Sequence, residues 1–186
     1  MIKDLLFVLY FFAPVGLANM VPPILSKITF LKDLNLPIDL NYQFRGKPIF
    51  GSHKTWRGLI GGIIVAILVL WLEVYIFDHS HFIQSITPRD VNYRTLPILL
   101  LGFLFGLGAL MGDAVESFFK RQIGIAAGQS LFFFDQTDYI FGAILTTFWM
   151  VSLDLKRYIL LVISFFMLHL VFSLIGYLIK VKNSPF

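Results

Sequence analysis

Charged side chains cluster between residues 112 and 138, where two strongly apolar segments are joined. The cluster contains two acidic pairs and one basic pair: Asp113 and Glu116, Asp135 and Asp138, and Lys120 and Arg121. Ionised carboxylates at membrane depth are costly and usually mark functional sites. The structural alternative is that Asp135 caps a helix and Glu116 pairs with Lys120 at i, i+4. That alternative accounts for one or two of the four acids, so we interpret the group as functional.

The spacing of these acids favours a metal site. Asp113, Glu116 and Lys120 lie at i, i+3 and i+7, on one face of a helix, and Asp135 and Asp138 repeat the i, i+3 spacing at the next helix. Antiparallel neighbours would bring the four carboxylates together, where they would repel each other without a cation. Mg²⁺ prefers oxygen ligands, usually one or two carboxylates plus substrate phosphates. We therefore predict that the four acids bind Mg²⁺ and that the three aspartates and Lys120 are catalytic.

A second cluster of cations precedes the second apolar segment. It lies among glycines and hydroxyl side chains and comprises Arg45, Lys47, Lys54 and Arg57. Such a composition predicts a phosphate-binding surface. Thr55 or Ser52 is also suited to cap the following helix, whose N-terminal amides favour anions. The alternative is a basic flank that only orients the protein in the membrane. Residues 51–55 are not a P-loop, because the Gly-Lys-Thr core and its spacing are absent.

Two polar residues interrupt apolar segments. Asn19, in the first segment, either lines a cavity or makes an ordinary interhelical hydrogen bond. His169, midway along the last segment, has no acidic partner in the sequence, and we interpret it as structural. His79 and His81 fall in a loop away from the proposed site.

The composition is that of an integral membrane protein. The 186 residues are 58% hydrophobic and only 14% charged, whereas soluble domains are about 45–50% apolar and about 25% charged. The absence of cysteine excludes disulfides, thiolate zinc sites and cysteine nucleophiles. A net charge of +4 suits anionic lipid headgroups or a phosphate-bearing substrate, and we expect no nucleic-acid partner. We expect the first apolar segment to be a retained helix, since it has no small-residue cleavage site.

The apolar segments predict an all-α fold of five transmembrane helices in a single membrane domain, residues 1–186. The expected helices are residues 5–25, 59–77, 95–118, 135–153 and 158–179, and the functional loops are residues 26–58 and 119–134. We expect the longer loop to be irregular or to contain short interfacial helices. The fourth helix spans comfortably only if it starts near Asp135. The third carries two GxxxG pairs, Gly102/Gly106 and Gly108/Gly112, which favour close helix contact.

The distribution of basic residues predicts the orientation. Cytoplasmic loops carry an excess of lysine and arginine. If the N-terminus is outside, ten of the 15 basic residues are cytoplasmic: Lys27, Lys32, Arg45, Lys47, Lys54, Arg57, Lys120, Arg121, Lys180 and Lys182. Both unusual loops then face the cytoplasm, and so does the expected active site of this multi-pass protein of the cell membrane.

The motifs around these residues resemble those of the CDP-archaeol synthases, short five-helix relatives of the CDP-diacylglycerol synthases. The similar segments are FGSHKTWRGLIGG from residue 50, GDAVESFFKRQIGI from residue 112 and FFFDQTDYIFGA from residue 132. The resemblance covers nearly the whole chain, and the GDxxxSFxKR and DQxDY patterns in this order are specific. One departure is residues 131–133, Leu-Phe-Phe, where the family pattern leads us to expect a proline or a polar residue.

The resemblance implies a Mg²⁺-dependent cytidylyltransferase that makes a CDP-lipid and pyrophosphate from CTP and a lipid phosphomonoester with two long chains. A phosphomonoester is largely dianionic at neutral pH and needs no protein nucleophile to attack CTP. Residues that match the motifs are Asp113, Ser117, Lys120, Arg121, Asp135, Asp138, Lys54, Thr55 and Arg57. We expect substrate binding by Arg45, Lys54, Thr55, Arg57, Ser117, Arg121 and Asn19.

Two other functions remain open from the sequence. A CDP-alcohol phosphotransferase also uses clustered aspartates, but its DxxDGxxAR pattern is not matched at Asp113 and its later aspartates are four residues apart, unlike Asp135 and Asp138. A small cation or phosphate transporter would also suit buried acids. The cations of both loops, expected on one side of the membrane, favour a one-sided active site instead. The sequence does not distinguish isoprenoid ether from diacyl chains, and it is compatible with an oligomer.

Overall fold

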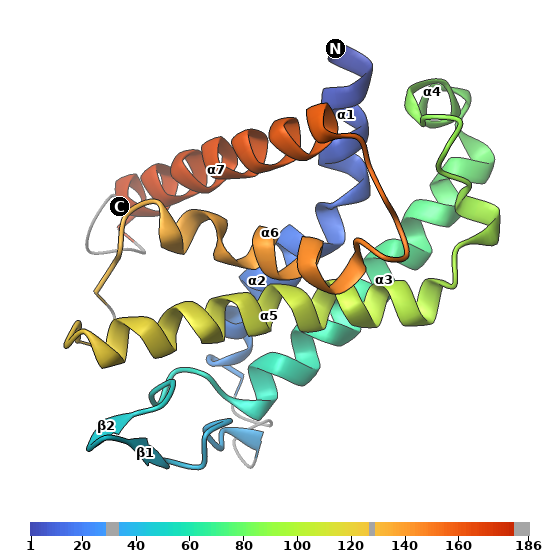
Figure 1. The fold of residues 1–186 in the computed structure, drawn as a ribbon. Helices are drawn as coiled ribbons and strands as arrows, with labels where there is room; N and C mark the ends of the chain where they lie inside the picture. Colours follow the sequence, from blue (N-terminus) through green and yellow to red (C-terminus); the bar gives the residue numbers. More distant parts are fainter. Residues whose placement is uncertain (29–33, 127–128, 181–186) are drawn as a thin grey trace.

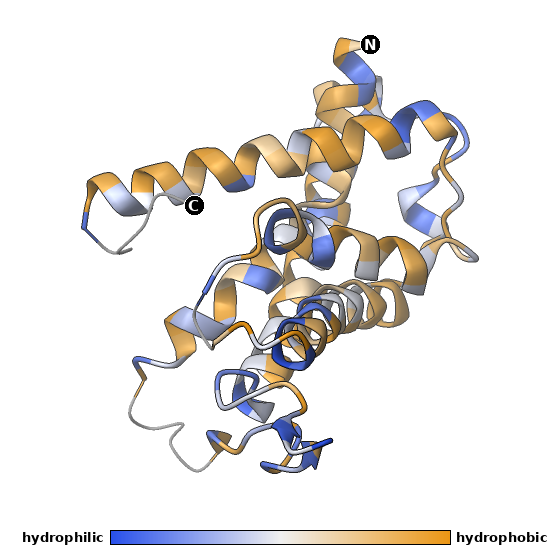
Figure 2. Cartoon of the chain, turned by 60° about the vertical axis from the view of Figure 1, so that its left-hand side comes forward, coloured by the Kyte–Doolittle hydropathy of each residue, from blue (hydrophilic) through white to orange (hydrophobic). Residues whose placement is uncertain are grey.

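The computed structural model describes residues 1–28, 34–126 and 129–180. It is a bundle of helices with one small hairpin (Figure 1). The helices are α1 Ile2–Phe11, α2 Ala13–Leu25, α3 Trp56–His79, α4 His81–Ile86, the short 3-10 turn η2 Tyr93–Thr95, α5 Ile98–Gln122, α6 Phe134–Thr147 and α7 Leu155–Leu178. The strands are β1 Gln43–Phe44 and β2 Lys47–Pro48. Figure 2 shows hydrophobic residues along the long helices and hydrophilic residues concentrated in loops and at helix ends.

The long helices meet the expectation of a multi-pass membrane protein. By length and composition, α3, α5 and α7 are each able to cross a membrane, and α1 with α2 adds a fourth span if the bent pair is counted as one. Helix α6 has only 14 residues, which is about 21 Å at a rise of about 1.5 Å per residue, while the hydrocarbon core is about 30 Å thick. The number of five spans therefore stays a prediction for the described part of the chain.

The first predicted helix is broken. Helices α1 and α2 meet at an angle of 43° on either side of Phe12. Pro14 lies in the first turn of α2, a position that proline favours because its missing N–H is not needed there. Pro22 and Pro23 fall in the last turn and end the helix soon afterwards.

Glycines determine how closely α5 approaches its two neighbours. A Cβ at Gly102 would lie 2.7 Å from the Cα of Ile67 in α3, and one at Gly106 would lie 2.6 Å from the Cα of Ile63. The second glycine pair faces α6, where a Cβ at Gly112 would overlap the backbone of Asp138. The two GxxxG pairs thus pack against different helices, which confirms their structural interpretation.

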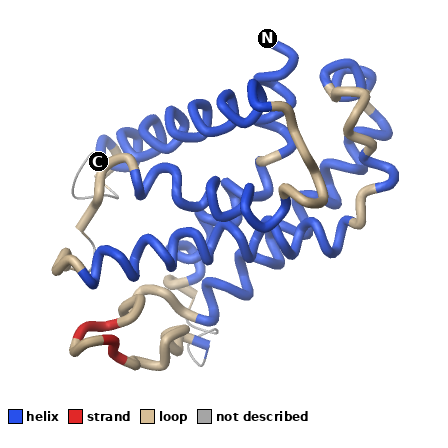
Figure 3. The backbone as a smooth tube through the Cα atoms, viewed as in Figure 1, coloured by secondary structure: helices blue, strands red, loops and turns tan. Residues whose placement is uncertain are grey.

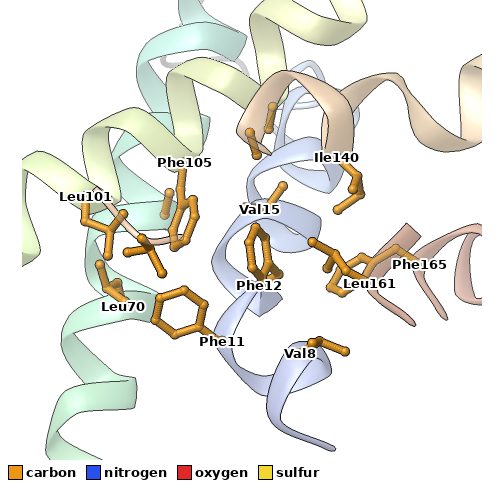
Figure 4. Close-up of a cluster of buried hydrophobic side chains, with 14 of the residues drawn as sticks. Val8, Phe11, Phe12, Val15, Leu70, Leu101, Phe105, Ile140, Leu161 and Phe165 are labelled. Carbon is orange, nitrogen blue, oxygen red and sulfur yellow. The ribbon is translucent and has the colours of Figure 1, made fainter. Parts of the chain in front are cut away.

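A core of aromatic and aliphatic side chains holds the helices together (Figure 4). Phe11 and Phe12, at the bend between α1 and α2, contact Phe105 of α5 with ring centroids 5.7 Å and 5.2 Å apart. Leu70 of α3 and Leu161 of α7 close the same core and are fully buried. The core joins residues of α1, α2, α3, α5, α6 and α7.

In the described part of the longer loop, residues 34–55, the backbone is mostly turns and irregular structure and includes one small hairpin (Figure 3). Strands β1 and β2 pair antiparallel, with Arg45 and Gly46 both at positive φ in the two-residue turn between them. The carboxylate of Asp39 accepts hydrogen bonds from the backbone N–H groups of Asn41, Phe50 and Gly51. These bonds organise the loop from within.

The hairpin is docked on the end of α5. Lys47 Nζ donates to the carbonyl of Gln122 at 2.6 Å, so β2 lies beside the last turn of that helix. The start of α3 and the end of α5 therefore lie at the same end of the molecule as the hairpin (Figure 1). The loop and the charged cluster are brought to one place by this arrangement.

Candidate active site

Helices α5 and α6 bring three of the four predicted acids together. One carboxylate oxygen from each of Asp113, Glu116 and Asp138 lies within 4.8 Å of the other two. The contact of Gly112 with the backbone of Asp138 allows this approach, because any side chain at Gly112 would force α6 away. Three oxygen-donor groups at such separations are able to share one small cation.

Asp135 has a different position from the one we predicted. Its Oδ1 accepts a hydrogen bond from Lys120 Nζ at 2.7 Å, and its Oδ2 accepts one from the backbone N–H of Leu131 at 3.1 Å. The same Lys120 Nζ lies 3.3 Å from Glu116, so the predicted i, i+4 pair is also present. Asp135 also lies within hydrogen-bond reach of the Glu116 side chain, so it adjoins the three-acid cluster directly and through Lys120 without being one of its three members.

The helix-capping alternative for Asp135 is wrong. The N-cap of α6 is Phe133, which has a φ of 75° and makes no side-chain capping bond. Asp135 lies within the first turn, where a negative charge is favourable near the positive end of the helix dipole. The unusual Leu-Phe-Phe sequence before the DQ pair has a packing role here, because the Phe133 ring contacts Phe166 of α7 at 5.7 Å between centroids.

The hairpin loop contributes a lysine to the acids. Lys54 Nζ lies 2.6 Å from Asp113 Oδ2. Thr55 caps α3 by accepting a hydrogen bond from the N–H of Gly58 at 3.3 Å, which confirms one of the two predicted caps and places Lys54 just before the helix. The backbone pairing of Pro37 with Thr55 fixes this segment against the rest of the loop.

Most of these side chains line one cavity of about 730 Å³ between α2, α3, α5, α6 and α7, whose lining does not include Asp138. Nine predicted site residues line it: Asn19, Lys54, Thr55, Asp113, Glu116, Ser117, Lys120, Arg121 and Asp135. Glu116, Lys120 and Arg121 are each less than a tenth exposed. Their charges are therefore poorly screened by water, so each interaction inside the cavity is stronger than on a surface.

Two charged side chains of the site, Asp138 and Arg121, have no oppositely charged partner among the described residues. Asp138 has no ion-pair partner among the described residues, and its Oδ1 accepts only the N–H of Tyr139. Lys54 and Lys120 each pair with acids, whereas the Arg121 side chain has no hydrogen-bond or ion-pair partner in the described part of the chain. The site thus combines an acidic group in need of a cation with a buried arginine in need of an anion.

Two predicted phosphate-binding arginines do not line the cavity. Arg45 is exposed in the hairpin turn, and its guanidinium lies 5.3 Å from the centroid of the Phe44 ring. Arg57 is buried, and its Nη2 donates to Asn35 Oδ1 at 2.9 Å. In this structure Arg57 positions the loop, and Arg45 lies at its tip.

The structure also adds residues to the site that sequence reasoning missed. Gln136, His169 and Ser173 line the same cavity, from α6 and α7. His169, which we interpreted as structural, thus lies in the cavity wall. The available signal was the i, i+4 spacing of His169 and Ser173 in an otherwise apolar helix, which puts both on one face.

Comparison with known proteins agrees with these features. Residues 1–186 match the CarS-like family, described as CDP-archaeol synthase. The CDP-archaeol synthase of Methanosarcina barkeri is 35% identical over 158 residues, covering 80% of this chain and 89% of the relative. That of Thermococcus onnurineus is 31% identical over 186 residues and covers 99% and 98%.

A solved structure shares the fold. It is described as an intramembrane enzyme for archaeal membrane lipid biosynthesis, and it matches with a TM-score of 0.67 at 21% identity, covering 88% of this chain and 90% of that one. The fold match, the relatives and the family match over all 186 residues agree with the paired acidic motifs of α5 and α6. This chain belongs to the CDP-archaeol synthase family of membrane cytidylyltransferases.

Proposed function

We propose that the protein transfers the cytidylyl group of CTP to a lipid phosphomonoester and releases pyrophosphate. The observation that supports this most strongly is the convergence of Asp113, Glu116 and Asp138 in the cavity region that also contains Lys54, Lys120 and Arg121. Carboxylates and cations in one place suit a reaction in which several phosphate groups meet. The name of the relatives points to an archaeol-type lipid with two long chains.

The proposed reaction needs positioning and charge neutralisation more than proton transfer. An oxygen of the lipid phosphate attacks the α-phosphorus of CTP, forming the new P–O bond. The bond from the α-phosphorus to the oxygen that bridges to the β-phosphorus breaks, and pyrophosphate carries the electron pair away. Since the attacking phosphate is already largely ionised at neutral pH, no general base is required.

The basic residues have separate tasks in this proposal. Arg121 is the prime candidate for a phosphate, because its buried guanidinium has no partner among the described residues. Lys120 is placed between Asp135 and Glu116 and supplies one fixed positive charge beside the reacting phosphates. Preorganised charges in a poorly hydrated site stabilise developing charge strongly.

The acids fit a hard divalent cation such as Mg²⁺. Asp113, Glu116 and Asp138 offer only oxygen donors, and Asp138 lacks a basic partner in the described chain. Mg²⁺ bound there would neutralise the triphosphate and polarise the α-phosphoryl group. Asp135 is not one of these three acids, and we propose that it acts by holding Lys120 in place.

The proposal includes an orientation in the cell membrane. The ion pairs and loops that build the site lie at the end of the molecule where ten of the 15 basic residues were predicted. Lys32 and Lys182 among those ten fall outside the described residues. We propose that this end faces the cytoplasm, where CTP is available, while the lipid chains stay in the bilayer.

A direct assay tests the function. Purified protein in proteoliposomes is incubated with Mg²⁺, labelled CTP and either a dialkylglycerol phosphate or the matching unphosphorylated alcohol. We expect a labelled CDP-lipid and stoichiometric pyrophosphate with the phosphate alone. Product from the alcohol, or ion flux without nucleotide turnover, would refute the proposal.

A further inference from the structure

The cavity has one wall without charge. Gln136 of α6 is 2% exposed, and its Oε1 is buried with no hydrogen-bond partner in the described part of the chain. It lines the cavity one residue after Asp135. A buried polar group left unpaired is unfavourable, so an amide at this position is best explained by a polar ligand group that is bound during the reaction.

Helix α7 continues this wall. His169 and Ser173 line the same cavity, and Ser173 is 4% exposed although its neighbours Phe172 and Leu174 are exposed. Two residues four apart lie on one face of a helix, so α7 turns one polar face to the cavity. Most of its remaining surface is apolar and is available to lipid.

Aromatic contacts hold this part of α7 against α6. The Phe133 ring lies 5.7 Å from the Phe166 ring, and the Tyr139 ring lies 6.2 Å from the His169 ring, centroid to centroid. Tyr139 Oη also donates to the carbonyl of Phe165 at 3.4 Å. The polar face of α7 is therefore fixed next to Gln136.

The nucleotide has a separate approach. A second cavity of about 510 Å³ lies between the hairpin loop and the end of α5, and it shares Arg121 with the first. Its polar lining includes Asn41, Gln43 and Ser52 of the loop. Arg121 is therefore open to a water-soluble nucleotide from the loop side, whereas the exposed surface of α7 on the other side is mostly apolar and suits the lipid.

We infer that the uncharged wall of Gln136, His169 and Ser173 binds the linkage oxygens that join the glycerol of the lipid substrate to its two chains. This inference rests on the proposed function. Beyond the phosphate, the polar atoms of such a lipid are its linkage oxygens, which only accept hydrogen bonds when they are ethers. Amide, imidazole and hydroxyl groups all donate. In Gln136 the donor is Nε2, and a turn of the amide about its last torsion places Nε2 where the unpaired Oε1 now lies.

The charged and uncharged walls then divide the lipid headgroup between them. Lys120 and Arg121 of α5 receive the phosphate, and the α6–α7 wall receives the neutral oxygens a few bonds away. Binding both parts fixes the direction of the attacking phosphate oxygen. It also gives the enzyme a means of distinguishing a two-chain glycerol lipid from a simple alkyl phosphate.

The test compares Gln136→Met with Gln84→Met as the matched control. Gln84 lies in α4, where its Nε2 donates to the carbonyl of Phe77, at the other end of the molecule. Initial rates are measured against lipid phosphate at saturating CTP and against CTP at saturating lipid. We expect Gln136→Met to raise the KM for lipid phosphate about tenfold, the effect of one lost hydrogen bond of about 1.4 kcal/mol, with the KM for CTP within twofold. Gln84→Met should leave both values unchanged.

A substrate analogue tests the same contact from the lipid side. In this analogue both linkage oxygens are replaced by methylene groups. Wild-type enzyme should lose about tenfold in kcat/KM with the analogue, and Gln136→Met should lose little more, because the two changes remove one interaction. If Gln136→Met is poorly folded, the wild-type enzyme with the analogue, and Ser173→Ala with both substrates, provide the measurement.

Two results would overturn the inference while leaving the proposed function intact. A raised KM for CTP with an unchanged KM for lipid assigns the wall to the nucleotide and overturns the inference. Equal rates with the natural lipid and the analogue in the wild type overturn it as well. An active wild-type enzyme is present in both cases, so the proposed function survives. If the wild type makes no CDP-lipid from any lipid phosphate, the proposed function itself fails.

Discussion

Lys54 and Asp113, which are 59 residues apart in the chain, form an ion pair with 2.6 Å between Nζ and Oδ2. The pair joins the hairpin loop to the acidic face of α5. When a metal ion occupies the cluster, Asp113 would have a second positive partner, and Lys54 would be free to bind a phosphate. The Lys54–Asp113 pair is therefore the contact through which metal or substrate binding would reach the loop.

The first prediction concerns the acidic cluster. Asp138→Asn keeps the size of the side chain but removes a charge that has no basic partner in the described chain, so the protein should fold and insert while activity falls by at least about a hundredfold. The Mg²⁺ concentration for half-maximal rate should also rise. Asp78→Asn, in an exposed pair with Arg94, is the matched control. Full activity of Asp138→Asn, or of wild type in excess chelator, would contradict a metal role.

Asp135 should behave differently from Asp138. Its contact is with Lys120 at 2.7 Å, so Asp135→Asn should lower kcat with little change in the Mg²⁺ requirement, and Lys120→Met should lower kcat at least as much. The measurement is a Mg²⁺ titration of each variant. An equal shift of the Mg²⁺ requirement in Asp135→Asn and Asp138→Asn would instead make Asp135 a metal ligand, as its spacing in the sequence first suggested.

The three arginines that we predicted to bind substrate should differ in effect. Arg121 is buried in the cavity wall without a partner in the described chain, so Arg121→Ala should reduce kcat/KM by about tenfold to a thousandfold. Arg45→Ala, at the exposed hairpin tip, should stay within about threefold of wild type. Arg57→Ala should lower thermal stability as well as activity, because Arg57 holds Asn35. Steady-state kinetics and a melting curve of each variant separate these cases.

The close contact between Gly112 of α5 and the backbone of Asp138 in α6 predicts an effect on stability. Gly112→Ala would set a Cβ 2.9 Å from the carbonyl carbon of Asp138, so α6 must move and the protein should lose about 1–3 kcal/mol of stability. Activity should fall too, since the same movement separates Asp113 from Asp138. Val115→Ala, on an exposed position of the same helix, should change neither. Unchanged melting of Gly112→Ala would show that the two helices do not need this contact.

Orientation can be measured directly because the chain has no cysteine. A cysteine in place of Ser85, an exposed residue of α4, should react with an impermeant thiol reagent added outside intact cells. A cysteine in place of Ser52, in the hairpin loop, should react only after the membrane is opened. The reverse pattern would place the active site on the outer side.

Several parts of this structure could be predicted from the sequence because they depend on local chemistry. Hydropathy identified the long helices, and the motifs of α5 and α6 identified the family. The prediction of an irregular loop did not include the short hairpin, although Gly46 at its turn is a local signal for positive φ. The end of α6 was placed six residues too far, at 153 instead of Thr147, because apolar residues continue beyond the helix.

The grouping of the acids depended on tertiary structure. The i, i+3 spacing put Asp135 and Asp138 near each other on α6, but that spacing does not determine which neighbour each one meets. Gly112 packs on the backbone of Asp138, and this contact places Asp138 in the three-acid cluster. Asp135 is paired with Lys120. The same applies to Arg57. Its local motif predicted phosphate binding, but in the folded protein it is buried and donates to Asn35.

The sequence by itself determined the class of protein, its long helices and the types of group available for chemistry. These follow from composition, hydrophobic patterning and short motifs, which act within a few turns of one helix. Only the tertiary structure decided that Asp113, Glu116 and Asp138 form one cluster, that Lys54 reaches it from the loop, and that Gln136, His169 and Ser173 complete the cavity. These contacts depend on helix crossing and rotation, which are fixed by close packing between segments far apart in the chain.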